Sequence, residues 1–176
     1  MTTNRNELQT MYLGPTGSPK SFNESSLPYP DQLGCMYRDS NGKWYQLVYL
    51  SSGATPLAAT DGYVAFWRNK TTSTISTKLA DSTRNEIAGV FDLASTVTIT
   101  EGNYCFIMKE GRHFNVYCSA GTAAKGDPAF AGSTTSGDVT FISAGAAAMP
   151  CFRIMGVMLS ATSSNRGAID LSMRTF

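Results

Sequence analysis

The residues of this chain that could carry chemistry are its single histidine, its aspartates and its four cysteines. His113 would act as the base if the chain used a Ser/His/Asp arrangement for nucleophilic catalysis. No Gly-x-Ser-x-Gly sequence is present to hold a serine on a sharp turn. His113 also follows Glu110-Gly111, which resembles a hairpin turn, where solvated histidines are common. We therefore expect His113 to lie at the surface without a catalytic role, and the chain not to be an enzyme.

Asp127 and Asp138 could form the paired carboxylates of a glycoside hydrolase. Each follows a glycine, and Gly-Asp is an ordinary turn sequence because the aspartate side chain bonds to nearby backbone. We expect both residues to form turns. The chain has no phosphate-binding loop, dinucleotide-binding fingerprint or EF-hand sequence, so no cofactor is expected.

The cysteines do not have the spacing of a common metal site. No pair forms Cys-x-x-Cys, and one histidine cannot complete a Cys₂His₂ zinc site. A Cys₄ site stays open, but single cysteines inside apolar runs are mostly small core residues. We expect reduced thiols and no metal at Cys35, Cys105, Cys118 and Cys151.

The composition argues against nucleic-acid and membrane functions. The net charge is +1 and no lysine or arginine run occurs, whereas nucleic-acid binding needs a clustered basic face. No apolar run approaches a membrane span, and residues 1–8 lack the apolar core of a signal peptide, so we expect a cytosolic chain. Charged residues make up only 15%, and the hydroxyl-rich remainder suits packing against other protein.

The first 33 residues show no sustained periodicity, and four prolines interrupt them. A helix is predicted only briefly, between Glu7 and Leu13. A disordered tail and an extended arm lying on a neighbouring subunit both stay open. Apolar side chains favour the arm, because solvated tails rarely carry so many. They are Leu13, Phe22, Leu27, Tyr29 and Leu33.

From residue 34 the pattern becomes that of β-strands. Residues 35–37 and 43–50 flank Asp39-Ser-Asn-Gly42, and an Asn-Gly pair between apolar runs predicts a hairpin whose two central residues take positive φ. A further strand is predicted at residues 63–67, and an exposed one at residues 74–77.

A second hairpin is predicted in the following half of the chain, with strands at 103–109 and 112–118 and a turn at Glu110-Gly111. Both faces of this hairpin would carry apolar groups, so one face would need a cover from the N-terminal half or from another subunit. The side chains on that face, together with those of the arm, are our candidate subunit or capsid contacts. The candidates are Leu13, Phe22, Leu27, Tyr29, Tyr104, Phe106, Met108 and Tyr117.

Short strands fill the rest of the chain, near residues 87–90, 128–130, 138–142, 151–159 and 168–173. Gly89 and Gly156 lie inside two of them, where a glycine marks a bulge or a sharp bend.

No helical pattern follows any of these strands, so we predict an all-β fold with strands that close on themselves. The predicted divisions are an extended N-terminal arm at 1–33, a β-hairpin region at 34–84 and a β-barrel domain at 85–176. Whether residues 34–84 complete the same barrel stays open.

The segment from Asn85 to Met173 resembles the capsid decoration proteins of tailed bacteriophages, also called cement or head-stabilising proteins. Gly34-Cys-Met-Tyr37 and Asn41-Gly-Lys-Trp-Tyr45 look like the front part of some of these proteins. The resemblance rests on the order and spacing of short motifs. They are Ile87-Ala-Gly-Val90, Thr100-Glu-Gly-Asn-Tyr104, Gly111-Arg-His-Phe-Asn-Val116, Ala124-Lys-Gly-Asp-Pro128, Gly137-Asp-Val-Thr140, Ile154-Met-Gly-Val157 and Ala168-Ile-Asp-Leu171.

The resemblance implies a small antiparallel β-barrel or β-tulip that binds the outside of an icosahedral shell, often as a homotrimer. Its partner would be the major capsid protein, and its location the virion surface after assembly in the bacterial cytoplasm. It implies no catalytic residues, cofactor, nucleic acid or membrane.

An alternative interpretation is a glycan- or receptor-binding module of a head fibre or tail. It would need an exposed aromatic platform. The candidates for that platform are Tyr37, Trp44, Tyr63 and Trp67.

Overall fold

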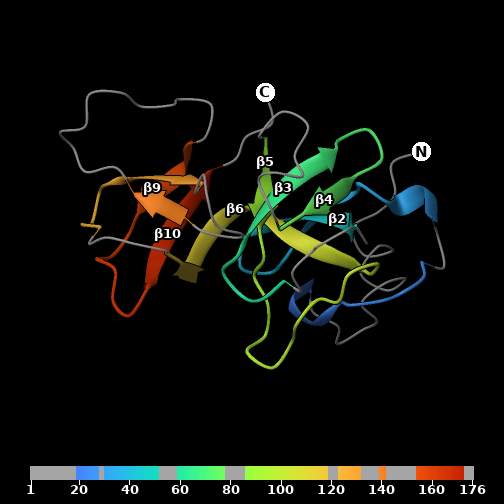
Figure 1. Ribbon diagram of the computed structural model, residues 1–176, viewed down its shortest axis with the longest axis horizontal. Helices are drawn as coiled ribbons and strands as arrows, with labels where there is room; N and C mark the ends of the chain where they lie inside the picture. The colour runs from blue at the N-terminus through green and yellow to red at the C-terminus, as the bar shows by residue number, and fades with distance from the viewer. Residues whose placement is uncertain are drawn as a thin grey trace.

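The structure, a computed structural model, is a ten-stranded sheet in which five strands close into a barrel (Figure 1). It describes residues 19–27, 30–51, 59–77, 86–118, 123–131, 139–141 and 154–172. The strands are β1 (Met36–Arg38), β2 (Trp44–Leu50), β3 (Val64–Asn69), β4 (Thr74–Ser76), β5 (Ile87–Val90), β6 (Tyr104–Tyr117), β7 (Pro128–Ala131), β8 (Val139–Phe141), β9 (Ile154–Met158) and β10 (Arg166–Ser172). Among the described residues, the 3-10 helices η2 (Pro19–Ser21) and η3 (Pro30–Gln32) precede them.

The barrel contains β2, β4, β3, β5 and β6 in that order, and a second pairing of β2 with β6 closes it. The predicted all-β barrel is therefore confirmed. The pairing of β2 with β4 is parallel, so the barrel is mixed rather than wholly antiparallel. Three of its strands come from residues 34–84 and two from residues 85–176, so the predicted boundary at residue 84 runs through the barrel.

The hairpin predicted at residues 103–118 is wrong, because β6 is one strand of 14 residues. Its first part pairs with β2, and its second part pairs with β10, with Gly111 opposite Leu171. Gly111 has a φ of +123°, and a Cβ there would lie 2.9 Å from Lys43 Cγ. The glycine that resembled a turn instead lets one strand bend past the β1–β2 hairpin on its way from the barrel into a second sheet of β10, β9, β7 and β8.

Two apolar clusters lie on the two faces of the barrel strands. One, inside the barrel, contains Cys105 and Ile107 of β6 with Val48, Ile75 and other side chains of the remaining barrel strands. The other, on the outer face, includes Phe22 of the N-terminal segment (residues 19–27) and Met155 and Ile169 of the second sheet. The prediction that β6 carries two apolar faces holds, and in the first part of the strand, from Cys105 to Lys109, the same chain covers both faces.

The described part of the predicted arm packs on its own barrel. Glu24 and Tyr104 exchange two backbone hydrogen bonds of 3.2 and 2.7 Å, and the Phe22 ring lies 5.4 Å from that of Phe106. Residues 19–27 therefore pack on the barrel of their own chain, and not on a neighbouring subunit as predicted for the arm. Leu13, Tyr29 and the helix predicted from Glu7 lie outside the described residues.

The predicted hairpin at Asp39–Gly42 is confirmed, since β1 and β2 pair on either side of it. The Asp39 carboxylate accepts hydrogen bonds from the backbone N–H groups of Asn41 and Lys43, both at 2.9 Å. Within this loop only Gly42 has positive φ, at +82°, so the expected positive φ at Asn41 is wrong. The loop is a turn closed by a left-handed glycine rather than a two-residue turn.

The strands predicted near residues 63–67, 87–90, 138–142, 151–159 and 168–173 are present as β3, β5, β8, β9 and β10. β4 is also present, but it is buried rather than exposed, because it lies between β2 and β3. No helix among the described residues is long and apolar enough to cross a membrane.

Gly89 and Gly156 have the predicted role. The pairing of β5 with β3 shifts its register next to Gly89, and the pairing of β9 with β7 shifts its register next to Gly156. A Cβ on Gly89 would lie 2.6 Å from Met108 O, and one on Gly156 would lie 2.0 Å from Asp170 O. Only glycine lets the neighbouring backbone approach so closely.

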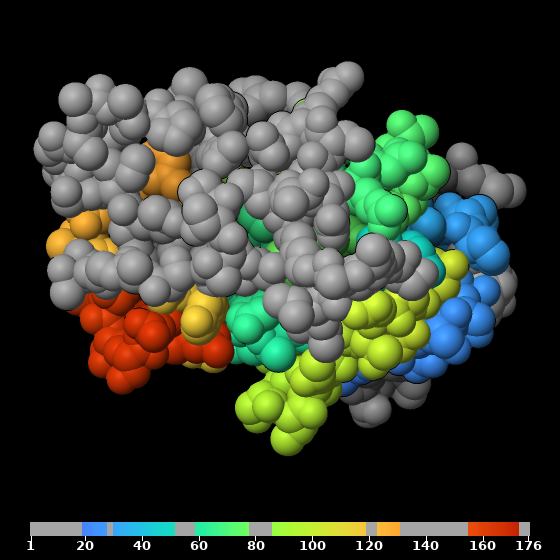
Figure 2. All heavy atoms as spheres, in the orientation of Figure 1, coloured from blue at the N-terminus to red at the C-terminus, as the bar shows by residue number. Residues whose placement is uncertain are grey.

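The N-terminal segment and the second sheet lie at opposite ends of the molecule. In Figure 2 the blue atoms of the N-terminal segment are at one end, and the red atoms of β9, β10 and their connection are at the other. β6 runs between the two ends (Figure 1).

The loop before β3 contacts β6 through backbone atoms at Gly62. Tyr117 N donates to Gly62 O at 3.0 Å, and Gly62 N donates to Phe91 O at 2.8 Å. Gly62 has a φ of +79°, and a Cβ there would lie 2.0 Å from Asn115 O. The approach of this loop to β6 therefore requires glycine.

We expect Gly62→Ala to lower the free energy of unfolding by about 3 kcal/mol or more, because a backbone atom has to move. Gly126→Ala is the matched control, since Gly126 has a φ of +95° but no atom within 4 Å of the position that a Cβ would occupy. The control should lose about 1–2 kcal/mol from the left-handed backbone alone. Urea unfolding measures both variants, and equal losses would contradict a steric role for Gly62.

Candidate functional site

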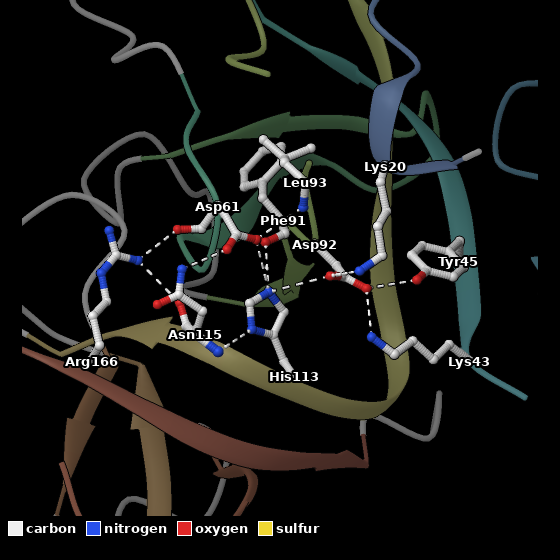
Figure 3. A network of polar contacts seen from close by, with 10 residues as sticks. All are labelled: Lys20, Lys43, Tyr45, Asp61, Phe91, Asp92, Leu93, His113, Asn115 and Arg166. Carbon is white, nitrogen blue, oxygen red and sulfur yellow. Dashed lines mark hydrogen bonds and ion pairs between the residues drawn. The ribbon is translucent and has the colours of Figure 1, made fainter. Parts of the chain in front are cut away.

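His113 is buried at the point where β6 leaves the barrel, and its side chain is 2% exposed. The expectation that it lies at the surface is therefore wrong. The cause is the continuity of β6, which places His113 in mid-strand opposite Ile169 of β10 rather than after a turn. Figure 3 shows His113 between the carboxylates of Asp61 and Asp92. We call these three residues the Asp61–His113–Asp92 cluster.

The hydrogen bonds of His113 define its tautomer. Nδ1 accepts a hydrogen bond of 3.0 Å from the backbone N–H of Asn115. Nε2 lies 3.1 Å from the carbonyl oxygen of Phe91 and 3.2 Å from Asp61 Oδ1. Because the amide can only donate and the carbonyl can only accept, the ring hydrogen belongs on Nε2.

Asp92 bonds to two lysines and a tyrosine. Lys20 Nζ lies 2.8 Å from its Oδ1, while Lys43 Nζ and Tyr45 Oη donate to Oδ2 at 2.8 and 2.7 Å. Burial by itself would raise the pKa of Asp92. The hydrogen bonds from Lys20, Lys43 and Tyr45 outweigh burial and lower that pKa to about 2.

The phenol of Tyr45 stays protonated as the donor in this arrangement. Burial is the main cause that raises the pKa of Tyr45, and the negative charge of Asp92 raises it further. Tyr45 is therefore a fixed hydrogen-bond donor to Asp92.

Asp61 is held by a different set of donors. Leu93 N donates to its Oδ1 at 3.0 Å, and Asn115 Nδ2 donates to its Oδ2 at 2.7 Å. Burial would raise the pKa of Asp61, but the hydrogen bonds from His113, Asn115 and Leu93 lower it overall. The neighbouring Gly62 lets this loop approach β6 closely enough for these bonds to form.

Arg166 extends the contacts to β10. Its guanidinium donates to the carbonyl oxygens of Asp61 and Asn115 at 2.8 and 3.1 Å. It also lies 5.1 Å from the centre of the Tyr117 ring, within the range of a cation–π contact. The cluster thus joins β6 to the N-terminal segment, the β1–β2 hairpin, the loop before β3, the end of β5 and β10.

The three residues of the cluster have ligand types found in metal centres, and their ligand atoms lie within 4.8 Å of one another. The contacts do not fit a cation, however. Oδ1 of Asp92 already pairs with Lys20, Oδ1 of Asp61 accepts from Leu93, and Nε2 of His113 carries a hydrogen. A metal ion would have to displace these groups next to two lysine ammonium groups, so we assign no metal to the cluster.

The cluster is also poorly arranged for general base catalysis. Both ring nitrogens of His113 bond to groups of the protein itself, and the ring is buried. A base needs a free nitrogen within hydrogen-bond reach of the proton that it removes. The geometry instead suits a structural role, in which buried charges are compensated inside the fold.

The other sequence candidates for chemistry are structural where the structure describes them. Asp127 Oδ2 accepts from Ala124 N at 2.9 Å, which confirms the predicted turn, while Asp138 lies outside the described residues. Cys105 and Cys118 are buried in the core, which confirms their prediction as core residues. Burial raises the pKa of Cys105. Cys35 is a partly buried thiol, and Cys151 lies outside the described residues.

Lys109 is a further buried charged group, at the end of the barrel interior. Its ammonium donates to the carbonyl oxygen of Ala88 and lies 5.2 Å from the centre of the Trp67 ring. Burial, and to a lesser degree the charge of Lys70, lower the pKa of Lys109 to about 8. Nothing in the sequence pattern marks this lysine as different from the others.

The predicted contact residues fall into three groups. Phe22, Phe106 and Met108 are core residues of their own chain, so they are corrected from subunit contacts to core positions. Leu27, Tyr104 and Tyr117 are partly buried, and their role as contacts stays a prediction. Leu13 and Tyr29 lie outside the described residues.

The aromatic platform of the glycan-binding interpretation loses two of its four members. Tyr37 and Trp67 are buried, and Lys109 lies over the Trp67 ring. Trp44 and Tyr63 are partly exposed, and Arg38 lies 5.7 Å from the centre of the Trp44 ring.

A scan against protein-family models and searches of curated proteins and solved structures find no match to this chain.

Sequence reasoning missed most of the cluster. Asp61 precedes Gly62 and Asp92 follows an apolar run, but nothing in either neighbourhood connects these two residues with each other or with His113. Lys43 and Lys20, which bond to Asp92, lie 49 and 72 positions before it along the chain. One signal in the sequence could have indicated a buried histidine. If residues 104–117 are predicted as one strand, the only histidine of the chain lies in the middle of a largely apolar run.

We expect Asp92→Asn to lower the free energy of unfolding by about 2 kcal/mol at pH 7. The folded-state pKa lies below the unfolded value of 3.8, so this stability is present above about pH 4 and is lost as the pH falls through about 2. The stability curves of the two proteins should converge over that window. Glu86→Gln, in an exposed pair with Lys70, is the control and should change stability little. A constant difference down to pH 2 would contradict the assignment.

We expect Lys109→Met to raise the free energy of unfolding by about 1–3 kcal/mol at pH 7, because it removes a buried charge. Since the folded-state pKa is about 8 and the ordinary value is 10.5, the wild type should gain stability as the pH rises between these values. The advantage of the variant should therefore vanish above about pH 10.5. Lys125→Met, at an exposed position, is the control. A pH-independent difference would refute the burial penalty.

Proposed function

We propose that this chain is a virion structural protein that binds the outer surface of a tailed-phage capsid. It would stabilise the shell by clamping neighbouring subunits of the major capsid protein. The observation that carries the proposal is the series of motifs between residues 85 and 173. In the fold these motifs belong to the scaffold itself, because they fall on β5, β6, β7, β8, β9 and β10 or directly before them.

The physical demands of this function suit the composition. A protein that binds many equivalent sites gains affinity from large shared surfaces, typically about 1,200–2,000 Å² for a stable interface, and from avidity. A weakly charged, hydroxyl-rich surface supplies such area without ion pairs that salt would screen. Attachment should therefore change little when the ionic strength is raised severalfold.

A binding role without catalysis is part of the proposal. It is supported by the Asp61–His113–Asp92 cluster, whose polar atoms bond to one another and to neighbouring groups of the chain. The remaining partners follow from the resemblance: self-association as a homotrimer, no nucleic acid and no membrane. The site of action would be the capsid surface, after assembly in the bacterial cytoplasm.

The rival function, a glycan- or receptor-binding module, receives less support. Aromatic platforms for sugars need exposed ring faces. Trp67 is buried under Lys109, and Tyr37 is in the core. We therefore keep shell binding as the proposal.

The position of the N-terminal segment sharpens the test of the arm. Lys20 and Phe22 belong to the fold, so removing residues 2–30 would damage the barrel as well as any arm. A truncation of residues 2–18 leaves these contacts in place and changes only the residues before them.

The test is co-sedimentation with empty, expanded shells assembled from the major capsid protein encoded alongside this chain. We expect saturable binding by the full chain, and binding weakened about tenfold or more after truncation of residues 2–18, with thermal unfolding unchanged. Truncation of residues 2–27 is the comparison and should lower stability, because it removes Phe22 from the core. Failure of the full chain to bind expanded shells would overturn the proposal, while unchanged binding by the shorter truncation would remove the arm from it.

A further inference from the structure

Phe114 is a large apolar side chain that the fold directs into solvent, and it is 71% exposed. Side chains alternate faces along a strand, and because His113 points into the core, Phe114 points away from it. His113 pairs with Ile169 and Val116 pairs with Gly167, so Phe114 and Asn115 together oppose the single residue Ala168. This bulge leaves Asn115 exposed beside Phe114 and returns Val116 to the core.

Phe114 lies beside a row of side chains that crosses the outer face of the second sheet. Arg112, two positions before it on β6, pairs with Asp170 of β10, which in turn pairs with Val157 of β9. Arg112 Nε lies 3.9 Å from Asp170 Oδ2, and the two side chains are 67% and 49% exposed. Val157 is 46% exposed. The row therefore presents a positive, a negative and two apolar groups to solvent.

The folding of the chain does not account for this exposed face. The inner face of the same strands is already buried, since Ile169 and Leu171 lie in the core. An exposed ion pair at this separation adds little to stability. Phe114 and Val157 are also two of the three exposed large hydrophobic side chains among the described residues, and they occur within one small region. Apolar groups gathered on a surface mark interaction sites.

We propose that this outer face, formed by Arg112, Phe114, Val157 and Asp170, binds a second copy of the same chain. The charges of the face indicate this partner. Arg112 and Asp170 stand side by side, so a second copy facing the first can place its Asp170 opposite Arg112 and its Arg112 opposite Asp170. Phe114 of each copy then packs near Val157 of the other and loses its contact with water.

The second sheet, whose strands β9 and β10 carry Val157 and Asp170, lies at the end of the molecule away from the blue N-terminal residues (Figure 2). A contact there leaves the N-terminal segment free for other partners. The contact is two-fold, so it joins copies in pairs and is separate from any contact that would close the homotrimer of the proposed function. It uses no residue that was among the sequence-predicted contacts.

The test uses two single charge reversals, Arg112→Asp and Asp170→Arg, measured by sedimentation velocity over a range of protein concentrations. We expect the wild type to self-associate and each reversal alone to weaken association about tenfold or more, because like charges then face each other. An equimolar mixture of the two variants should regain association, since Asp at position 112 of one copy meets Arg at position 170 of the other. The pair within each chain is broken in both variants, so only contact between unlike copies can produce this recovery.

Phe114→Ser tests the apolar part of the contact and should weaken association about tenfold or more without changing thermal unfolding. Lys70→Glu is the matched control, because Lys70 belongs to a similarly exposed ion pair on β3–β5 rather than on this face, and it should leave association unchanged. A wild type that stays monomeric, or a mixture that fails to recover, would overturn the inference. Shell binding measured on the same samples is a separate readout, so a chain that binds shells without pairing through this face refutes this contact and leaves shell binding standing.

Discussion

A strand shared by two sheets has to satisfy two sets of partners, and in this chain that strand is β6. Its first part closes the barrel against β2 and its second part begins the second sheet against β10. The two directions meet at Gly111, whose positive φ and missing side chain let the strand bend past Lys43. Because β2 and β10 both depend on β6, neither the barrel closure nor the second sheet could form if the chain turned back at that glycine.

The buried charges stabilise the same junction. Asp92 lies next to the point where the β1–β2 hairpin, the N-terminal segment and β6 meet, and it bonds to Lys20, Lys43 and Tyr45. A buried carboxylate is costly unless it is paired, so the arrangement excludes conformations in which any of these elements is misplaced. We regard the cluster as a device for specificity of the fold rather than as a source of catalytic groups.

Local patterns in the sequence predict most of the strands but not the junction. The β1–β2 hairpin and the roles of Gly89 and Gly156 can be predicted because each depends on neighbouring residues only. The turn predicted at Glu110-Gly111 is wrong because a glycine that permits a bend and a glycine that permits a turn look alike in sequence. Because of that error, His113 is predicted at the surface, and its contacts with Asp61 and Asp92 are not predicted. The other members of the cluster come from segments that only the closed barrel brings together.

The exposed face of the second sheet follows from the same geometry. The chain covers the outer face of its barrel with Phe22 and neighbouring residues, so the apolar faces predicted for β6 do not require another subunit. What remains uncovered is Phe114, which points away from the core because its neighbour His113 points into it, and Val157 across the sheet. A fold that buries most of its other large apolar groups, among the residues described, gains nothing for its own stability by exposing these two. Their exposure is therefore better explained by a partner than by folding, and the neighbouring Arg112 and Asp170 would suit a partner that carries the same two charges in reverse order.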